Sequence, residues 1–170
     1  MKPDASIPLR PSAELAQLKL RVDTREQRPW FFPEEYATVR RDTLEYGDYA
    51  LEGDSWAIER KSLTDFVGTV CAEWDRFVRE LARMPVEPQR VIIVEAGLAD
   101  ALEYIKETTS PDKCSDRMKY FMRRVAQLTM IGVSVLFCDS AELAAIVAWR
   151  LFRRRAAFLN GVDDLPYSES

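Results

Sequence analysis

Histidine is absent from the 170 residues of this chain. Its absence excludes Ser-His-Asp triads, H-E-x-x-H zinc sites and every nuclease that uses a histidine base. The three cysteines, Cys71, Cys114 and Cys138, lie far apart without C-x-x-C spacing, so the sequence suggests neither a zinc ribbon nor a disulfide framework. Any hydrolysis must therefore use carboxylates, lysine, water and metal.

Long apolar runs are also absent. No uninterrupted apolar stretch approaches the roughly 20 residues of a membrane helix, and the N-terminus, M-K-P-D-A-S-I-P, lacks the apolar core of a secretory signal. We therefore expect a soluble cytoplasmic protein with no membrane partner.

Positive charge is limited and unevenly distributed. The net charge of -4 argues against a general nucleic-acid coat protein, because non-specific duplex affinity depends on Lys and Arg. Positive charge is concentrated at Arg123-Arg124 and in R-L-F-R-R-R at Arg150 to Arg155. A helical arginine run of this kind is more often a solvated face than a binding site.

The chain length suits one globular domain. Residues 1–14 are rich in proline and lack periodicity, which predicts an extended or flexible arm. We expect the folded domain over residues 15–159 and an acidic tail, prone to fraying, over 160–170.

Five stretches are typical of strands. L-K-L-R-V-D at Leu18 to Asp23 alternates apolar and polar residues and ends at a carboxylate. Tyr46 to Leu51 and Ser55 to Arg60 predict a hairpin with its turn at Glu52 to Asp54. R-V-I-I-V-E and V-S-V-L-F, the latter at Val133 to Phe137, are apolar runs typical of central strands buried on both faces.

The remaining periodic segments predict helices. Ser62 has the character of an N-cap, and the apolar spacing after it predicts one long amphipathic helix that stops before Pro85. A short helix is expected near Leu98 to Tyr104, another from about Ser115 to Met130, and a last one capped at Ser140 or Asp139. This mixture predicts an α/β sheet with helices on both faces.

The strand ending at Lys61 carries charge where a strand should enter the core. Because side chains alternate between faces, Glu59 and Lys61 point one way, whereas Ile58 and Arg60 point the other. If the hairpin pairs as predicted, Asp48 on the neighbouring strand lies within reach of the Glu59 face.

Carboxylates gathered at this strand end need compensation. The first strand delivers Asp23 at its own end, and three carboxylates about 5 Å apart would repel by about 3 kcal/mol per pair at an effective dielectric near 20. Mg²⁺ or Mn²⁺ suits such oxygen ligands, and a nearby lysine can position or deprotonate an attacking water. The set is chemically sufficient for phosphodiester hydrolysis without histidine.

Each feature also has a simpler interpretation. Glu59 and Lys61 alone would be a surface ion pair worth at most about 1 kcal/mol, and Asp65 fits a capping box with Ser62 as well as a site. Trp30-Phe31-Phe32 fits a loop packed on the core better than a platform for splayed bases. Arg76, Arg79 and Arg83 share one helix face, which could equally contact DNA phosphates or face solvent.

The whole string is more specific than its parts. G-D-Y at Gly47 to Tyr49 followed by E-R-K-S-L-T-D at Glu59 to Asp65 resembles the G-D-X(n)-E-R-K-X3-D signature of the XPF family of structure-specific DNA endonucleases. V-D-T-R-E at Val22 to Glu26 is similar to that family's first-strand motif. The resemblance covers roughly Leu18 to Leu151.

The resemblance implies a restriction-endonuclease-like, PD-(D/E)XK fold, with a central mixed sheet flanked by helices. It also implies a metal-dependent endonuclease that cuts DNA near flaps, forks or branched junctions in repair or recombination. Carried over residue by residue, it makes Asp23, Asp48 and Glu59 metal ligands for Mg²⁺ or Mn²⁺ and Lys61 the water-orienting group. Supporting positions of the family are matched by Arg25, Glu26, Arg60 and Asp65. Because the side-chain alternation places Arg60 off the metal face, we expect it to brace a neighbouring carboxylate or to contact a phosphate.

One departure from the family concerns the C-terminus, where eukaryotic and archaeal members carry a helix-hairpin-helix pair that this sequence lacks. We therefore expect a small stand-alone form of bacterial or phage origin, associated with the nucleoid, whose DNA affinity comes from a homodimer or a separate DNA-binding partner. A catalytically silent DNA-binding or scaffold subunit is the alternative, although such subunits tend to lose the acidic residues. A sequence-specific restriction-type nuclease fits the motif less well.

Overall fold

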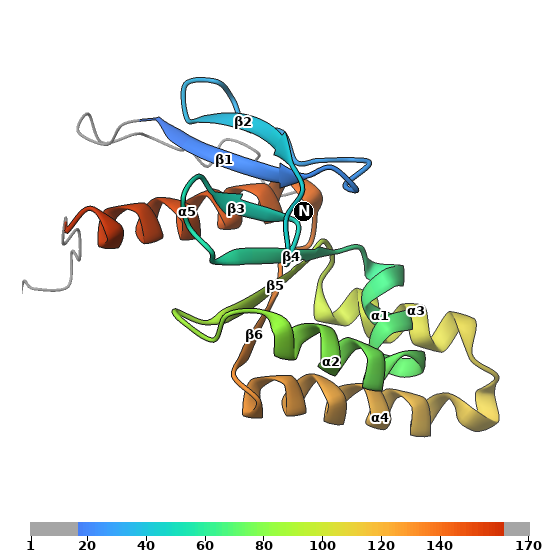
Figure 1. The fold of residues 1–170 in the computed structure, drawn as a ribbon. Coiled ribbons are helices and arrows are strands. Elements are labelled where there is room, and N and C mark those ends of the chain that lie inside the picture. The colour runs from blue at the N-terminus through green and yellow to red at the C-terminus, as the bar shows by residue number, and fades with distance from the viewer. Residues whose placement is uncertain (1–16, 162–170) are drawn as a thin grey trace, which may run out of the picture.

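The computed structural model describes residues 17–161, so the predicted arm at 1–14 and most of the predicted tail at 160–170 lie outside the described residues. In the described part, six strands form one sheet with helices on both of its faces (Figure 1). The strands are β1 (Leu18–Asp23), β2 (Ala37–Asp42), β3 (Tyr49–Leu51), β4 (Ala57–Lys61), β5 (Arg90–Val94) and β6 (Val133–Phe137). The helices are α1 (Leu63–Ala72), α2 (Trp74–Arg83), α3 (Leu98–Thr108), α4 (Pro111–Met130) and α5 (Ala141–Leu159).

The sheet is mixed, and its strand order is β2-β1-β3-β4-β5-β6. β3 pairs antiparallel with β1 on one side and with β4 on the other. Tyr49 of β3 lies opposite Ile58 of β4, which confirms the predicted hairpin. β2 runs parallel to β1, and β4, β5 and β6 run parallel to one another. The carboxyl ends of the last three strands therefore meet at one edge, where Lys61 pairs with Val94 and Val94 pairs with Phe137.

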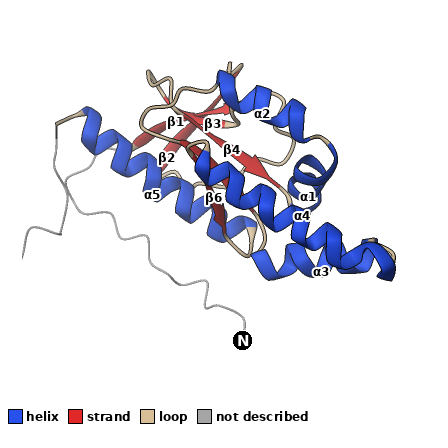
Figure 2. Ribbon diagram, turned by 90° about the horizontal axis from the view of Figure 1, so that it is seen from below, coloured by secondary structure: helices blue, strands red, loops and turns tan. Residues whose placement is uncertain are grey.

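The sheet separates two hydrophobic cores. α5 packs on one face, where it contacts β1, β3 and β5 and contributes Trp149 and Phe152 to the first core. The helices α1 to α4 lie across the sheet from α5 and form the second core (Figure 2). β5 contributes Val91 and Ile93 to the first core and Ile92 and Val94 to the second. The prediction of a central strand buried on both faces is confirmed for β5.

The two edge strands differ from expectation. β2 was not predicted, and it is mostly exposed, so its sequence A-T-V-R-R-D carries little apolar signal. β6 was predicted as a buried central strand, but it is the other edge, and after Val133 its side chains are only half buried. Its apolar composition has a different cause, since Leu136 packs on the core beneath α5 whereas Val135 and Phe137 pack on the core beneath α4.

The prediction of a single long helix after Ser62 is wrong, because this segment forms two helices, α1 and α2. Glu73 leaves the helical conformation (φ -120°, ψ 25°), ends α1 and begins α2. The apolar spacing continues across the break because Val70, Trp74 and Phe77 are buried in the same core. Periodicity alone therefore could not reveal this bend.

The other helices extend beyond their predicted bounds. α3 runs to Thr108, and α4 begins at Pro111 rather than near Ser115, because proline is favourable in a first helical turn. Ser140 caps α5 as predicted, since its hydroxyl accepts a hydrogen bond from the Leu143 N–H at 3.2 Å. Between residues 17 and 161, no helix has the length and apolar character needed to cross a membrane.

A buried ion pair joins the C-terminal part of α5 to the turn between β3 and β4. Both nitrogens of the Arg155 fork donate to Asp54, at 2.7 and 3.1 Å, and the Trp56 N–H donates to the same carboxylate at 3.2 Å. Burial alone would raise the pKa of Asp54, but the hydrogen bonds from Arg155 and the backbone lower it below its ordinary value. The pair therefore stabilises the ionised form of Asp54.

Asp54→Ala should destabilise the protein by about 3 kcal/mol, because removing one partner leaves a largely buried charge uncompensated. Since the pKa of Asp54 is lowered in the folded state, this contribution is present above the unfolded-state pKa near 3.8 and is lost as the pH falls through the folded value. Chemical denaturation of both proteins at pH 7 and pH 3 measures the difference. Lys106→Ala removes the exposed pair with Glu103 and should cost less than about 1 kcal/mol. Equal effects of the two variants would contradict the prediction.

Candidate active site

The charged end of β4 presents different side chains to the two faces of the sheet, as predicted. On the α2 side, Lys61 Nζ lies 2.8 Å from Glu59 Oε1 and 5.8 Å from the centre of the Phe77 ring. Burial disfavours the charged form of Lys61, but the carboxylates of Glu59 and Asp48 outweigh this and raise the pKa of Lys61. Lys61 is therefore an ammonium group at neutral pH.

Asp48 is held beside Glu59 by backbone hydrogen bonds. The Asp48 N–H donates to Ile58 O at 2.9 Å, and the Arg60 N–H donates to Asp48 Oδ2 at 2.7 Å. Gly47 makes the close approach possible because it has a positive φ of 62°, and a Cβ there would lie 2.9 Å from the Ala57 Cβ. Glycine at position 47 is therefore required by the geometry of the β3–β4 pair.

The charge of Asp48 is poorly compensated. Burial, and after it the negative charge of Glu59, raises the pKa of Asp48 well above its ordinary value, although the Arg60 N–H and Lys61 act in the opposite direction. Two carboxylates held side by side in this way store electrostatic repulsion in the folded state. A positive charge between them would relieve it.

Asp23 is placed differently from the other two predicted ligands. Its side chain is 1% exposed, and its oxygens accept hydrogen bonds from the Arg25 N–H, the Arg25 guanidinium and the Leu44 N–H, all at 2.6 to 3.0 Å. The Arg25 side chain is the main cause that lowers the pKa of Asp23 to about 2. Its role as a metal ligand stays a prediction, and it would require Arg25 to release these oxygens.

A cleft of about 430 Å³ lies over the carboxylate pair. Arg25, Asp48 and Glu59 line the sheet side, whereas Phe77 and residues of the second half of α2 line the opposite side. In the part of the chain that the structure describes, no three Asp, Glu or Cys side chains gather closely enough to hold a metal ion. The two carboxylates are nevertheless hard oxygen donors of the kind that Mg²⁺ and Mn²⁺ prefer, so the donor chemistry of the cleft fits such an ion.

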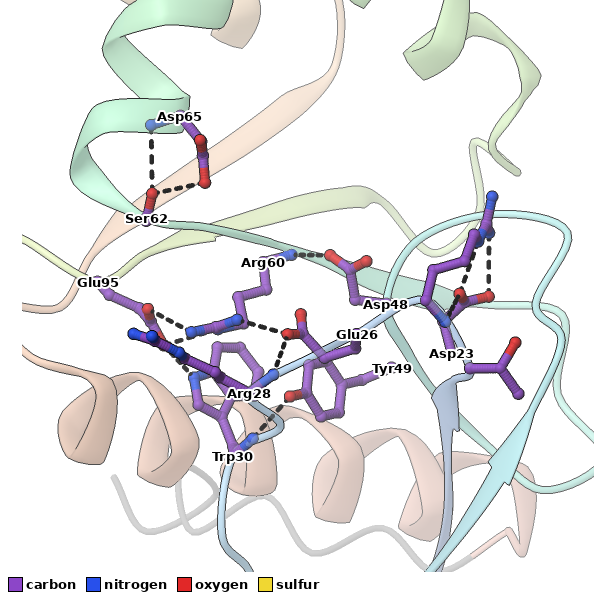
Figure 3. Close-up of polar contacts among 12 residues, drawn as sticks. Asp23, Glu26, Arg28, Trp30, Asp48, Tyr49, Arg60, Ser62, Asp65 and Glu95 are labelled. Atoms are coloured by element: carbon purple, nitrogen blue, oxygen red, sulfur yellow. Dashed lines mark hydrogen bonds and ion pairs between the residues drawn. The ribbon is translucent and has the colours of Figure 1, made fainter.

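On the α5 side of β4, Arg60 binds two carboxylates (Figure 3). Its guanidinium donates to Glu26 Oε1 at 2.8 Å and to the two oxygens of Glu95 at 2.7 and 2.8 Å. The guanidinium also lies 6.0 Å from the centre of the Trp30 ring. Arg60 therefore braces neighbouring carboxylates, as the side-chain alternation predicted, and Glu26 lies with Arg60 rather than in the cleft.

Glu95 was missed by the sequence analysis. It follows the apolar run of β5, and its N–H donates to Lys61 O at 3.0 Å, which brings it to the end of β4. Its position directly after an apolar strand could have indicated its role. The carboxyl ends of parallel strands share one edge of a sheet, so a residue that follows β5 lies near the end of β4.

The remaining predicted residues lie around this centre. Asp65 is exposed and exchanges hydrogen bonds with Ser62, whose hydroxyl caps α1, at some distance from Asp48 in Figure 3. Arg83 lines the cleft. Arg76 is paired on the surface of α2 with Glu73 at 2.6 Å and Glu80 at 3.4 Å, and Arg79 is exposed.

Comparisons with known proteins agree with this arrangement. A family model described as the ERCC4 domain matches residues 22–148, a segment that contains both the cleft and the Arg60 network. A search of curated protein sequences finds no match.

Two solved structures of XPF from Aeropyrum pernix share the fold. One matches with a TM-score of 0.59 and 21% identity, and the match covers 84% of this chain and 69% of the other. The second, described as a complex with DNA, gives a TM-score of 0.59 with 22% identity over 84% of this chain and 66% of the other. The restriction-endonuclease-like fold predicted from the sequence is thereby confirmed.

The repulsion between Asp48 and Glu59 leads to an unusual expectation for stability. Asp48→Asn should raise the free energy of unfolding by about 1 to 3 kcal/mol at pH 8 in EDTA, because it removes a poorly compensated buried charge. The pKa of Asp48 is raised on folding, so the wild type loses this stability as the pH rises from its unfolded-state pKa towards the folded value. The gain should vanish near pH 3.

Thermal unfolding in EDTA across this pH range measures the effect. Asp42→Asn, a change to a partly exposed carboxylate on β2, serves as the matched control and should show no such gain. A destabilised Asp48→Asn protein at pH 8 would contradict the expectation.

Proposed function

The chain belongs to the ERCC4 domain family, and from that premise we propose that it is a divalent-metal-dependent endonuclease acting on branched or flapped DNA. The observation that carries the proposal is the pairing of Asp48 with Glu59 in a cleft, with Lys61 Nζ 2.8 Å from the Glu59 carboxylate. Metal-dependent phosphodiester hydrolysis uses acidic oxygens that hold a cation, and two such carboxylates lie beside Lys61 at one strand end.

We propose Asp48 and Glu59 as the residues that hold the cation, with Asp23 as a third candidate. When bound, Mg²⁺ or Mn²⁺ supplies charge stabilisation at the phosphoryl group and a more acidic water. The raised pKa of Asp48 supports this assignment, because a site built to bind a cation is electrostatically strained without it.

Lys61 acts as a donor rather than as a base. Its raised pKa keeps the ammonium group charged, so it can orient an attacking water or a phosphate oxygen but cannot accept a proton at neutral pH. Burial against Phe77 restricts its movement, and its ion pair orients Glu59. Arg25, which is anchored on Asp23 and lines the cleft, is suited to contact a substrate phosphate.

The preference for branched DNA and the need for a homodimer or a separate DNA-binding partner remain part of the proposal. The relative described as a DNA complex supports DNA as the ligand class. The alternative, a catalytically silent scaffold subunit, predicts DNA binding without cleavage.

Cleavage tests the proposal directly. Labelled duplex, flap, fork and four-way junction DNA of random sequence should be cut near the branch point with Mg²⁺ or Mn²⁺ and left intact in EDTA. Glu59→Gln, which keeps the shape of the side chain but removes its charge, should lower kcat by at least about 100-fold, the range for groups that act on charge in the transition state.

The matched control is Glu103→Gln, a charge removal on the exposed surface of α3, which should cleave like the wild type. DNA binding without cleavage under either metal would favour the scaffold subunit. Cleavage confined to one sequence on linear duplex would favour a restriction-type enzyme.

The two arginines of α2 should differ in their contribution to DNA binding. Arg83→Ala removes a guanidinium that lines the cleft, so the affinity should fall and the dependence of log Kd on log salt concentration should decrease by about one unit. Arg76 is already paired with Glu73 and Glu80, and Arg76→Ala should change both quantities less. Fluorescence anisotropy titrations in EDTA at several salt concentrations compare the two variants, and equal losses would contradict the assignment of Arg83 to the DNA path.

A further inference from the structure

A second hollow lies on the α5 side of the sheet, behind the cleft. It has a volume of about 600 Å³, within the range of small-molecule sites, and lies between the loop of residues 28–36 and α5. We call it the aromatic pocket, because Trp30, Phe31, Tyr36 and Trp149 line it together with Arg28 and Arg60. The proposed cleavage chemistry does not use it.

The loop that forms this pocket is firmly anchored on both sides of Phe31. The Trp30 N–H donates to the Tyr49 hydroxyl at 2.7 Å, and the Trp30 ring stacks on Tyr49 at 4.4 Å with an interplanar angle of 17°. The Trp30 indole also donates to Glu95 Oε1 at 2.5 Å (Figure 3). Phe32 is buried against the edge of Tyr49. The prediction of a packed loop therefore fits Trp30 and Phe32.

Phe31 is the exception, since 81% of its surface is exposed. Its buried neighbours, together with the prolines at 29 and 33, restrict the backbone that places it at the pocket. A loop whose backbone is already anchored loses little backbone entropy when a planar ligand stacks on its exposed aromatic side chain.

The charges around the pocket fit a strand with phosphates. Arg28 lines one part of it, and the guanidinium carbons of Arg150 and Arg153 lie 5.6 and 5.5 Å from the centre of the Trp149 ring. Two carboxylates also line the pocket: Glu95, whose charge is paired with Arg60, and Glu142 at the beginning of α5. Phosphates would therefore lie beside Arg28, Arg150 and Arg153, away from Glu142. Aromatic faces beside arginines are the usual means of binding single-stranded nucleic acid without sequence preference.

The aromatic pocket and the proposed cleavage cleft lie on opposite faces of the sheet but close to the same strand end. Arg25 lines the cleft and Arg28 lines the pocket, and Cα atoms three residues apart lie within about 11 Å. In β4, Arg60 lines the pocket, whereas Glu59 directly before it lines the cleft. A few nucleotides of one strand would therefore reach from one site to the other around this end of the sheet.

We propose that the aromatic pocket receives one unpaired nucleobase of the DNA strand, stacked on Phe31, while Arg28 contacts a neighbouring phosphate. This proposal rests on the proposed action on DNA, and it supplies a reason for branch selectivity. A paired base inside a duplex cannot enter the pocket, so a strand bound across both sites must be single-stranded on the pocket side.

The test uses the full chain with 2-aminopurine, whose fluorescence reports base stacking, placed at successive positions in the single-stranded arm of a flap. Binding is followed in EDTA, so no cleavage interferes. We expect a fluorescence change at one or two positions only. Phe31→Ala should abolish it and weaken the binding of single-stranded DNA by at least about fivefold, with blunt duplex affinity unchanged. Because Phe31 is exposed, the variant should keep the melting temperature of the wild type.

Two variants serve as controls. Phe158→Ala removes another exposed phenylalanine, at the end of α5 and outside the pocket, and should bind like the wild type. Phe31→Tyr keeps an aromatic face and should retain both the affinity and the fluorescence change.

Three results would overturn the proposal. They are unchanged single-strand affinity of Phe31→Ala, an equal loss of affinity for blunt duplex, and failure of the wild type to bind single-stranded DNA. Flap cleavage by the same proteins separates this proposal from the proposed activity. Metal-dependent cleavage with no role for Phe31 would reject only the pocket, whereas position-specific stacking without cleavage would reject only the nuclease activity.

Discussion

Arg60 connects the parts of the molecule that form the candidate site. Its guanidinium joins Glu26 from the segment after β1 to Glu95 from the end of β5, and its backbone N–H donates to Asp48. Burial would lower the pKa of Arg60, but these two carboxylates raise it, so the charge is permanent. A largely buried arginine with two carboxylate partners is favourable only in this geometry. One residue therefore contacts Asp48 through its backbone and Glu26 and Glu95 through its side chain on the opposite face of the sheet.

The two faces of the sheet differ in how completely their charges are balanced. On the α5 side, Arg60 faces two carboxylates, and the Trp30 indole donates to one of them, which leaves a rigid and well-satisfied network. On the α2 side, Lys61 is shared between Glu59 and Asp48, and the pKa of Asp48 stays raised. Strain of this kind, located in a cleft and supported by a rigid layer behind it, is typical of functional sites.

Short-range sequence patterns predict features that are set within one strand or helix, such as the face to which each side chain points. Alternation in β4 was sufficient to assign Glu59, Arg60 and Lys61 to their faces, because strand geometry fixes them once the register is known. β2, the bend at Glu73 and the place of β6 at an edge depend on which elements become neighbours, and short-range spacing carries no such information. The same limit applies to Glu95, which reaches the site from a strand distant in sequence, and to the Asp23 carboxylate, whose oxygens are taken by its own loop.

The register of β4 links the core to the chemistry. A slip of one residue would turn Arg60 into the cleft and Glu59 into the aromatic pocket, because side chains alternate along a strand. Ile58, fully buried on the α5 side, prevents this slip, and the hydrogen bonds of Asp48 to residues 58 and 60 hold the same register from the neighbouring strand. Hydrophobic burial at Ile58 therefore directs the carboxylates to one face of the sheet and the arginine and its aromatic neighbours to the other. A single strand end can in this way present opposite chemistry on the two faces of the sheet.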